Sequence, residues 1–245
     1  MHLFYSREIL DQRLKILDKE HHHCSRVLRL NKKDEILATD GLGNFYTCEI
    51  EEIKKDSTIC LIRQKKKSDE KELLNVDLAI APTKNIERFE WCVEKCTEIG
   101  IRSITPIWCE RSERKTIRTD RIENIIVAAA KQSLKARFTS FNSPVTHSEY
   151  AHQCRNNQKY IAHCLDDSSK PFLGNRVDLG SDISVMIGPE GDFSEEEIKL
   201  ANKAGFQAVS LGANRLRTET AGVYACAVIH AVNEIRNEHN RDFQG

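Results

Sequence analysis

Two loops in the C-terminal third of the chain carry the residue types best suited to hold a ligand. In the first, Gly188 and Gly191 bracket Pro189 and Glu190 directly after an apolar run, and glycine lets a ligand come close to the backbone. The second loop, residues 211–221, carries two arginines and two threonines before an expected helix. Because a helix N-terminus has free N–H groups and a positive dipole, this loop suits an anionic group. Ordinary strand-to-helix turns and helix capping would use the same glycines and threonines.

The charge of the chain is balanced overall but concentrated in one segment. The 245 residues hold 37 basic and 37 acidic side chains, so no net field steers a polyanion toward the protein. Residues 111–137, in contrast, hold eight basic and three acidic side chains, which suits local contact with nucleic acid. Ordinary solubility is the alternative explanation. The candidate RNA contacts are Arg26, Arg29, Arg111, Arg114, Lys115 and Arg118.

Several classes of protein are disfavoured by composition. No apolar run reaches the roughly 18 residues that a transmembrane helix needs, and the N-terminus lacks the apolar stretch of a signal peptide. Nine cysteines without a C-x-x-C pair indicate free thiols in a reducing cytoplasm rather than a zinc site. The His21-His22-His23-Cys24 run does not predict a metal site, because adjacent side chains on a helix point in different directions. We expect a solvated or RNA-facing turn there, no metal and no membrane contact.

Hydrophobic periodicity divides the chain into two regions. In the first, short alternating runs predict strands over 36–39, 45–53 and 58–62, joined by turns, as in a small antiparallel barrel. The polar stretch 63–71 is expected to be a linker. The predicted domains are therefore residues 1–71 and 72–245.

In the second region, strand patterns alternate with helical patterns, which favours an α/β fold with a parallel sheet covered on both faces. Two helices are expected over residues 85–99 and 120–134. A third helix is expected to begin at Ser194, and the last helix is expected to end near Ile235. Ligands bind beyond the carboxyl ends of the strands in such sheets, and both glycine-containing loops follow expected strands. The expected strands are 76–81, 104–108, 160–164, 183–187 and 208–211.

The order of these motifs resembles a known family. Gly188-Pro189-Glu190-Gly191, then Leu211-Gly212, then Leu216-Arg217-Thr218-Glu219-Thr220-Ala221 resemble the C-terminal signature of the SPOUT methyltransferases. Lys95-Cys96-Thr97-Glu98-Ile99-Gly100 and Gln132-Ser133 narrow the resemblance to the ribosomal RNA small subunit methyltransferase E family. The resemblance covers nearly the whole chain. Asp192 and Lys33 depart from the family pattern, because they stand where the family usually has glycine.

This resemblance implies a fold, a reaction and partners. The implied fold is an N-terminal PUA-like β-barrel followed by a SPOUT-type α/β domain with a trefoil knot, assembled as a cytoplasmic homodimer. The implied reaction transfers a methyl group from S-adenosyl-L-methionine to N3 of a uridine in 16S rRNA, in the assembled 30S subunit. The residues implied to bind the cofactor are Ala162, His163, Ile187, Gly188, Pro189, Gly191, Leu211, Gly212, Leu216, Arg217, Thr218 and Ala221.

Methylation at N3 of uracil sets clear chemical requirements. The nitrogen must lose its proton, and negative charge then spreads over the ring, so a cation such as Arg217 or Arg215 would stabilise the transition state. Glu190 or Glu219 could accept the proton, although the dipole of the following helix also explains an acidic residue at position 219. The candidate catalytic residues are therefore Arg217, Glu190 and Glu219.

Other functions are weighed against this one. A class I methyltransferase or a Rossmann dehydrogenase would need a glycine-rich turn after the strand at 76–81, and Pro82-Thr83-Lys84 offers none. A non-catalytic RNA-binding protein on the same scaffold and a SPOUT-type tRNA ribose methyltransferase remain open. The last helix carries an apolar stripe at Ala221, Tyr224, Val228, Ala231 and Ile235 that predicts a dimer interface.

Overall fold

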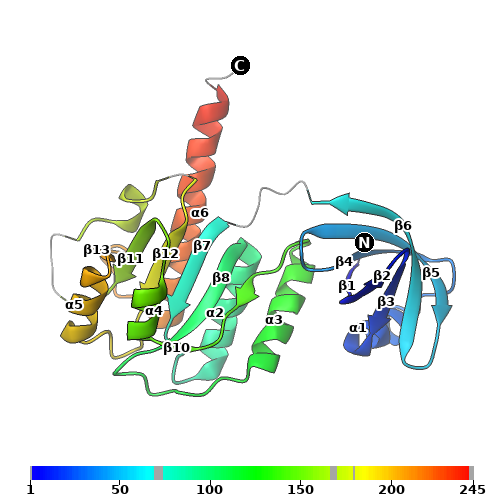
Figure 1. Ribbon diagram of the computed structural model, residues 1–245, viewed down its shortest axis with the longest axis horizontal. Helices are drawn as coiled ribbons and strands as arrows, with labels where there is room; N and C mark the ends of the chain where they lie inside the picture. Colours follow the sequence, from blue (N-terminus) through cyan, green and yellow to red (C-terminus); the bar gives the residue numbers. More distant parts are fainter. Residues whose placement is uncertain (1, 69–73, 166–169, 179, 243–245) are drawn as a thin grey trace. The chain divides into compact units, whose positions relative to one another are not determined.

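The computed structural model describes residues 2–68, 74–165, 170–178 and 180–242, with side chains described to residue 235 (Figure 1). The chain divides into two compact units, Met1–Glu72 with Val127–Phe138, and Leu73–Ile126 with Thr139–Gly245. The predicted domain boundary between residues 71 and 72 lies outside the described residues and stays a prediction. The return of residues 127–138 to the first unit was not expected from the sequence.

The first unit is a curled six-stranded sheet with the order β1-β4-β5-β6-β3-β2. Neighbouring strands are antiparallel, except that β1 and β4 are parallel. The three predicted strands correspond to β4, β5 and β6, whereas the first three strands were missed. The strands are β1 (Leu3–Tyr5), β2 (Glu8–Leu10), β3 (Arg13–Leu17), β4 (Glu35–Thr39), β5 (Asn44–Ile53) and β6 (Ser57–Lys67).

The prediction of a linker from residue 63 was wrong as far as Lys67. Strand β6 continues through the lysines because Lys65, Lys66 and Lys67 pair with Tyr46, Phe45 and Asn44 on β5. Backbone hydrogen bonds hold this end of the ladder while the lysine side chains stay exposed. Hydrophobic alternation cannot reveal a strand segment of this kind, because none of its side chains enters the core.

The histidine run forms a helix instead of a solvated turn. Helix α1 (Asp18–His22) continues into a π-helical turn over His23–Val27. His21 is buried, and its ring nitrogens lie 2.9 Å from Thr58 Oγ1 and 3.1 Å from the Lys55 carbonyl oxygen. This histidine therefore ties the helix to the neighbouring strand. Among the described residues, no group of three or more metal-ligating side chains comes together.

Residues 127–138 are held to the sheet of the first unit by specific contacts. Thr39 Oγ1 donates to the Ala136 carbonyl oxygen at 2.9 Å, and the Phe138 N–H donates to the Gly41 carbonyl oxygen. Gly41 has a φ of 72°, and a Cβ atom there would lie 2.9 Å from the Phe138 ring. A side chain at position 41 would therefore be both strained and in collision with Phe138.

The second unit contains the predicted parallel sheet, with the strand order β10-β8-β7-β12-β11-β13 and β9 paired to β8. All of these pairs are parallel. The five predicted strands correspond to β7, β8, β11, β12 and β13, and the two-residue strands were missed. The strands are β7 (Leu74–Ile80), β8 (Ile101–Trp108), β9 (Ser140–Phe141), β10 (Val145–Thr146), β11 (Gln158–Ala162), β12 (Ile183–Ile187) and β13 (Gln207–Val209).

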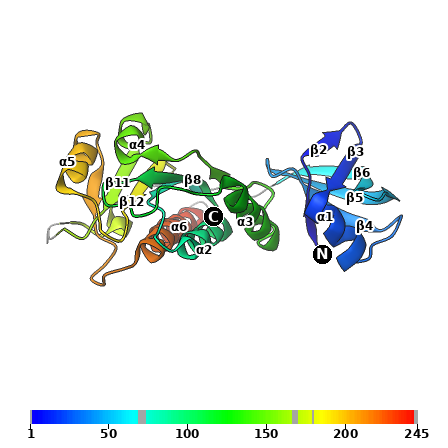
Figure 2. The ribbon, with the colours of Figure 1, turned by 90° about the horizontal axis from the view of Figure 1, so that it is seen from below.

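Helices cover both faces of this sheet. Figure 2 shows α2 and α6 side by side on one face and α4 and α5 on the other. No helix in the described part of the chain is long and apolar enough to span a membrane, and all nine cysteines are free as predicted. The helices that pack here are α2 (Ile86–Ile99), α4 (His147–Gln153), α5 (Glu195–Lys203) and α6 (Thr218–Asp242), while α3 (Thr119–Gln132) runs from the second unit into the first.

Capping residues set where these helices begin. Asn85 accepts a hydrogen bond from the Glu87 N–H at the start of α2, and the predicted capping box of Ser194 and Glu197 is present on α5. Helix α4 was missed, although Thr146 and Glu149 form a capping box of the same kind, with threonine in place of serine. That sequence pattern was the available signal for the missed helix.

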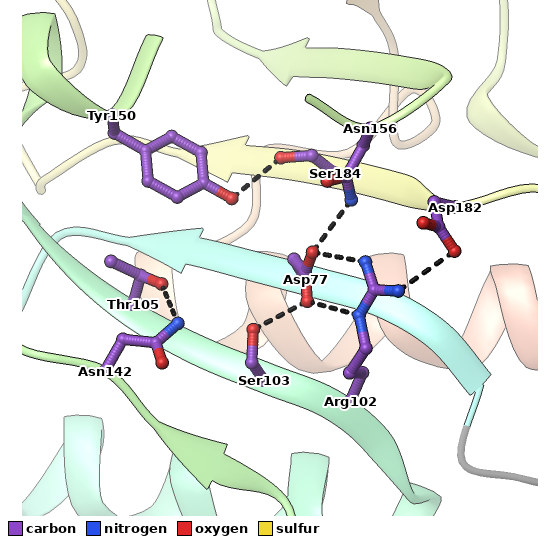
Figure 3. A network of polar contacts seen from close by, with 9 residues as sticks. All are labelled: Asp77, Arg102, Ser103, Thr105, Asn142, Tyr150, Asn156, Asp182 and Ser184. Atoms are coloured by element: carbon purple, nitrogen blue, oxygen red, sulfur yellow. Dashed lines mark hydrogen bonds and ion pairs between the residues drawn. The ribbon is translucent and has the colours of Figure 1, made fainter. Parts of the chain in front are cut away.

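A partly buried polar network joins the strands near their N-terminal ends (Figure 3). Arg102 donates to both carboxylate oxygens of Asp77, at 2.9 and 2.6 Å, and also to Asp182. Ser103 and Asn156 donate to the same Asp77 carboxylate, at 2.6 and 2.8 Å. Burial alone would raise the pKa of Asp77, but the hydrogen bonds from these partners outweigh it and lower that pKa.

The network predicts how stability depends on pH. The pKa of Asp77 is lower in the folded state than in the unfolded state. Its contribution to folding stability is therefore complete above the pKa of the unfolded state, roughly 4, and is lost as the pH falls through the pKa of the folded state. Asp77→Asn should therefore lower the free energy of unfolding at pH 7 by about 2 kcal/mol, as expected for lost hydrogen bonds to a charged group. Urea titrations of both proteins from pH 7 to pH 3 measure this difference, which should shrink at low pH.

The matched control is Asp120→Asn, which removes a carboxylate from an exposed pair with Arg118. Exposed pairs contribute about 0–1 kcal/mol, so this variant should unfold close to the wild type. A stability difference for Asp77→Asn that stays constant across the whole pH range would contradict the assignment.

Candidate functional site

The two glycine-containing loops meet where the parallel strands end. Residues 188–194 connect β12 to α5, and residues 210–217 connect β13 to α6. Strand β11 lies between β12 and β13, so the carboxyl ends of all three strands face the same edge of the sheet (Figure 1). The parallel arrangement therefore brings together segments that are far apart in the sequence, as predicted.

Two adjoining hollows lie at this edge, with volumes of about 350 and 680 Å³. Because they have six lining residues in common, we treat them as one site. The shared residues are Ala162, Cys164, Asp192, Arg215, Leu216 and Ala221.

Most residues that the sequence assigned to the cofactor line one hollow or both. Gly191 and Glu219 line neither hollow, and Glu190 lines the smaller one. Sequence reasoning missed Arg88, which lines the smaller hollow from helix α2, and Lys170, which lines the larger. The predicted cofactor residues in the lining are Ala162, His163, Ile187, Gly188, Pro189, Leu211, Gly212, Leu216, Arg217, Thr218 and Ala221.

Thr218 joins the two loops. Its hydroxyl, in the first turn of α6, donates to the Gly188 carbonyl oxygen at 3.1 Å, and the side chain is buried. Gly188 itself is tightly packed, since a Cβ atom there would lie 3.1 Å from the Phe193 ring. The start of α6 is therefore fixed to the end of β12.

Asp192 joins the first loop to the end of β11. One carboxylate oxygen accepts from the Cys164 N–H at 2.7 Å, and the other accepts from the Phe193 N–H at 2.8 Å. The backbone of Asp192 is left-handed, with a φ of 62°. This conformation is the one that glycine adopts without strain, which explains why glycine and aspartate can exchange here. Lys33, the other departure from a family glycine, is left-handed as well, with a φ of 77°.

Gly191 faces a protein side chain rather than either hollow. A Cβ atom at this position would lie 3.2 Å from Arg111 Cβ, and Arg111 Nη1 donates to the Gly191 carbonyl oxygen at 3.0 Å. The absence of a side chain here makes room for Arg111. The structure thus gives Gly191 a packing role next to the hollows, and a cofactor contact by this residue stays a prediction.

The three candidate catalytic residues differ sharply in environment. The Arg217 side chain is exposed at the smaller hollow and makes no hydrogen bond or ion pair with the described residues. Glu190 is exposed and accepts from the Lys84 N–H at 2.9 Å. Glu219 is buried, its Oε1 lies 3.9 Å from Arg88 Nε, and its Oε2 has no hydrogen-bond partner. Direct contact with a ligand in the hollows is therefore open to Arg217 and Glu190.

The candidate RNA contacts in the second unit mostly have partners within the protein. Arg114 donates to the carbonyl oxygens of Thr83 and Lys84, and Arg118 pairs with Asp120. Lys115 is exposed on the same segment. In the first unit, Arg26 and Arg29 are exposed. A role of these residues in RNA binding stays a prediction.

Comparison with known proteins identifies the family. Residues 69–230 match a family described as the RNA methyltransferase domain. Residues 16–62 match a second family, described as the RNA methyltransferase PUA domain. Ribosomal RNA small subunit methyltransferase E of Synechocystis is 30% identical over 233 residues, which cover 93% of this chain and 76% of the relative. The chain belongs to the ribosomal RNA small subunit methyltransferase E family. The Aquifex aeolicus enzyme of the same name is 29% identical over 94% of this chain and 99% of its own length.

Solved structures agree with the family assignment. A probable rRNA-methyltransferase from Porphyromonas gingivalis is 36% identical, covers 96% of this methyltransferase and 100% of its own chain, and has a TM-score of 0.89. Ribosomal RNA small subunit methyltransferase E from Neisseria gonorrhoeae, solved bound to S-adenosyl methionine, is 27% identical with a TM-score of 0.82, over 95% of this chain and 98% of its own. The PUA-like first unit and the SPOUT-type α/β unit are thereby confirmed, and the trefoil knot stays a prediction.

The contact between Thr218 and Gly188 predicts a stability difference between two neighbouring threonines. Thr218→Val keeps the side-chain shape but leaves the Gly188 carbonyl oxygen without its donor, which should cost about 1–3 kcal/mol. Thr220→Val, two residues further along α6 and exposed, should change stability by roughly 0.5 kcal/mol or less. Urea unfolding of the two variants measures the difference, and equal losses would show that the hydroxyl of Thr218 does not hold the loop.

Proposed function

We propose that this methyltransferase transfers the methyl group of S-adenosyl-L-methionine to N3 of a uridine in 16S rRNA of the assembled 30S subunit, in the cytoplasm. The observation that carries this proposal is the convergence of three strand ends on adjoining hollows lined by both glycine-containing loops. The family and the cofactor-bound relative support the choice of methyl donor.

The residues of the hollows fit such a cofactor. Gly212 has a φ of 112°, and nothing lies within 4 Å of the position that its Cβ atom would take, so its backbone is open to a ligand. Leu211 and Leu216 flank it, and Ala162 with His163 forms the wall from strand β11. In our proposal the adenosine lies against these backbone groups, and the sulfonium group of the cofactor supplies an activated methyl.

The remaining charged residues suit the transfer. The bond from the methyl group to sulfur breaks as the bond to N3 forms, and the N3 proton leaves to a carboxylate or to water. Arg217 would stabilise the negative charge that develops on the uracil ring. Glu190 is the better placed proton acceptor of the two carboxylates, because it lines the smaller hollow and Glu219 does not.

The decisive test is nucleoside analysis of ribosomal RNA from a strain that lacks the gene. We expect mass spectrometry to show that 3-methyluridine is lost from 16S rRNA, and that the wild-type gene restores it. Unchanged 3-methyluridine in 16S rRNA, or loss of a ribose methylation from tRNA instead, would overturn the proposal. Normal RNA modification in every class would indicate a non-catalytic RNA-binding protein.

We also propose a homodimer that forms through α6. The face of this helix with Gly222, Ala225, Cys226 and Ile229 is buried within the chain. The stripe at Ala221, Tyr224, Val228, Ala231 and Ile235 has exposed members, with Tyr224 at 40% and Ile235 at 56% exposure. Exposed apolar stripes of this kind mark association surfaces.

Light scattering at micromolar concentration should therefore report twice the mass of one chain. The double substitution Tyr224→Glu and Ile235→Glu should shift the protein toward the monomer, because it places charges in an apolar interface. A monomeric wild-type protein would contradict this proposal.

A further inference from the structure

Arg88 reaches the site from an element outside the two glycine-containing loops. It lies in helix α2, and its side chain lines the smaller hollow together with Arg215 and Arg217. Its Nε atom lies 3.9 Å from Glu219 Oε1, and the side chains of Arg88 and Glu219 are 42% and 9% exposed. This is the only interaction of the Arg88 side chain with the described residues, and it leaves both Nη groups of the guanidinium available.

Glu219 is an unusual partner, because its carboxylate is buried and its contact with Arg88, at 3.9 Å, is an ion pair without a hydrogen bond. Its Oε2 has no hydrogen-bond partner, and an ionised carboxylate out of water is costly unless a charge compensates it. Arg88 is the cation beside it, and the N-terminus of α6 adds a favourable dipole. The buried carboxylate therefore lies where its charge attracts the guanidinium at the edge of the hollow.

The charges around the smaller hollow favour a polyanion. Three arginines, at positions 88, 215 and 217, line it with two carboxylates, Glu190 and Asp192. Both carboxylates accept hydrogen bonds from backbone N–H groups. S-adenosyl-L-methionine has one carboxylate, one ammonium and one sulfonium group, so it is a net cation that three arginines do not attract. An RNA phosphate matches the planar, doubly donating face of a guanidinium.

We propose that Arg88, positioned by Glu219, binds a backbone phosphate of the RNA next to the nucleotide that enters the site. This inference rests on the proposed function, since it assumes that RNA approaches the smaller hollow. Arg88 would contact the substrate directly, and Glu219 would act through Arg88 as a positioning residue.

The experiment measures binding to unmethylated 30S subunits from the deletion strain over a series of salt concentrations. Each phosphate contact contributes roughly 0.7–0.9 to the slope of log affinity against log salt. Arg88→Ala should lower that slope by about this amount and weaken binding roughly tenfold, as expected for one charge-assisted contact. Affinity for S-adenosyl-L-methionine, measured by calorimetry, should not change.

The matched control is Lys199→Ala, which removes one exposed positive charge from helix α5, outside the lining of both hollows. It should keep the wild-type slope. An unchanged slope for Arg88→Ala, or a loss of cofactor affinity with normal binding to the subunit, would overturn the inference.

The role of Glu219 is tested by a double-mutant cycle. Glu219→Gln keeps the shape and should weaken subunit binding in the same direction as Arg88→Ala but by less, and the double variant should bind no more weakly than Arg88→Ala alone. If the double variant instead loses subunit affinity by the product of the two single-variant factors, Glu219 does not act through Arg88. Because these measurements concern binding, a wild-type protein that binds subunits and cofactor without transferring a methyl group would refute the proposed function and leave the Arg88 result interpretable.

Discussion

The site depends on one constraint, the parallel alignment of β11, β12 and β13. A parallel sheet places all carboxyl ends on the same edge, so Ala162, Gly188 and the loop after Val209 become neighbours although many residues separate them in sequence. Hydrogen bonds then fix the loops at the ends of these aligned strands. Thr218 fastens α6 to the end of β12, and Asp192 fastens the loop after β12 to the end of β11.

The opposite edge of the same sheet shows what keeps the strands in register. There, Asp77 on β7 accepts from Arg102 and Ser103 at the start of β8 and from Asn156 just before β11. Apolar side chains alone would tolerate a shift between buried strands, whereas a carboxylate with several fixed donors would lose them in any other register. At one edge the side chains bind one another and hold the strands in register, whereas at the other edge the loops present backbone groups to a ligand.

Much of this arrangement could be predicted from the sequence, because it depends on local signals. The capping box at Ser194 and Glu197, Gly100 at the end of α2 and the apolar runs of the buried strands each act within a few residues. The features that the sequence did not predict have a different cause in common. The lysine-rich end of β6 and the site residue Arg88 obtain their roles from partners in distant segments, namely β5 and Glu219. No periodicity or motif near those residues records such a pairing.

The path of the chain has a consequence for how this protein can be divided. The first unit is completed by residues 127–138, which follow a long excursion through the second unit, so the chain passes between the units three times. A fragment that ends near residue 71 would lack the carbonyl group that Thr39 binds and the ring that fills the space beside Gly41. The two units are therefore not interchangeable modules, because each is built from two separate segments of the chain. Recombination at any single point of the gene would separate at least one of the two units from part of its own packing.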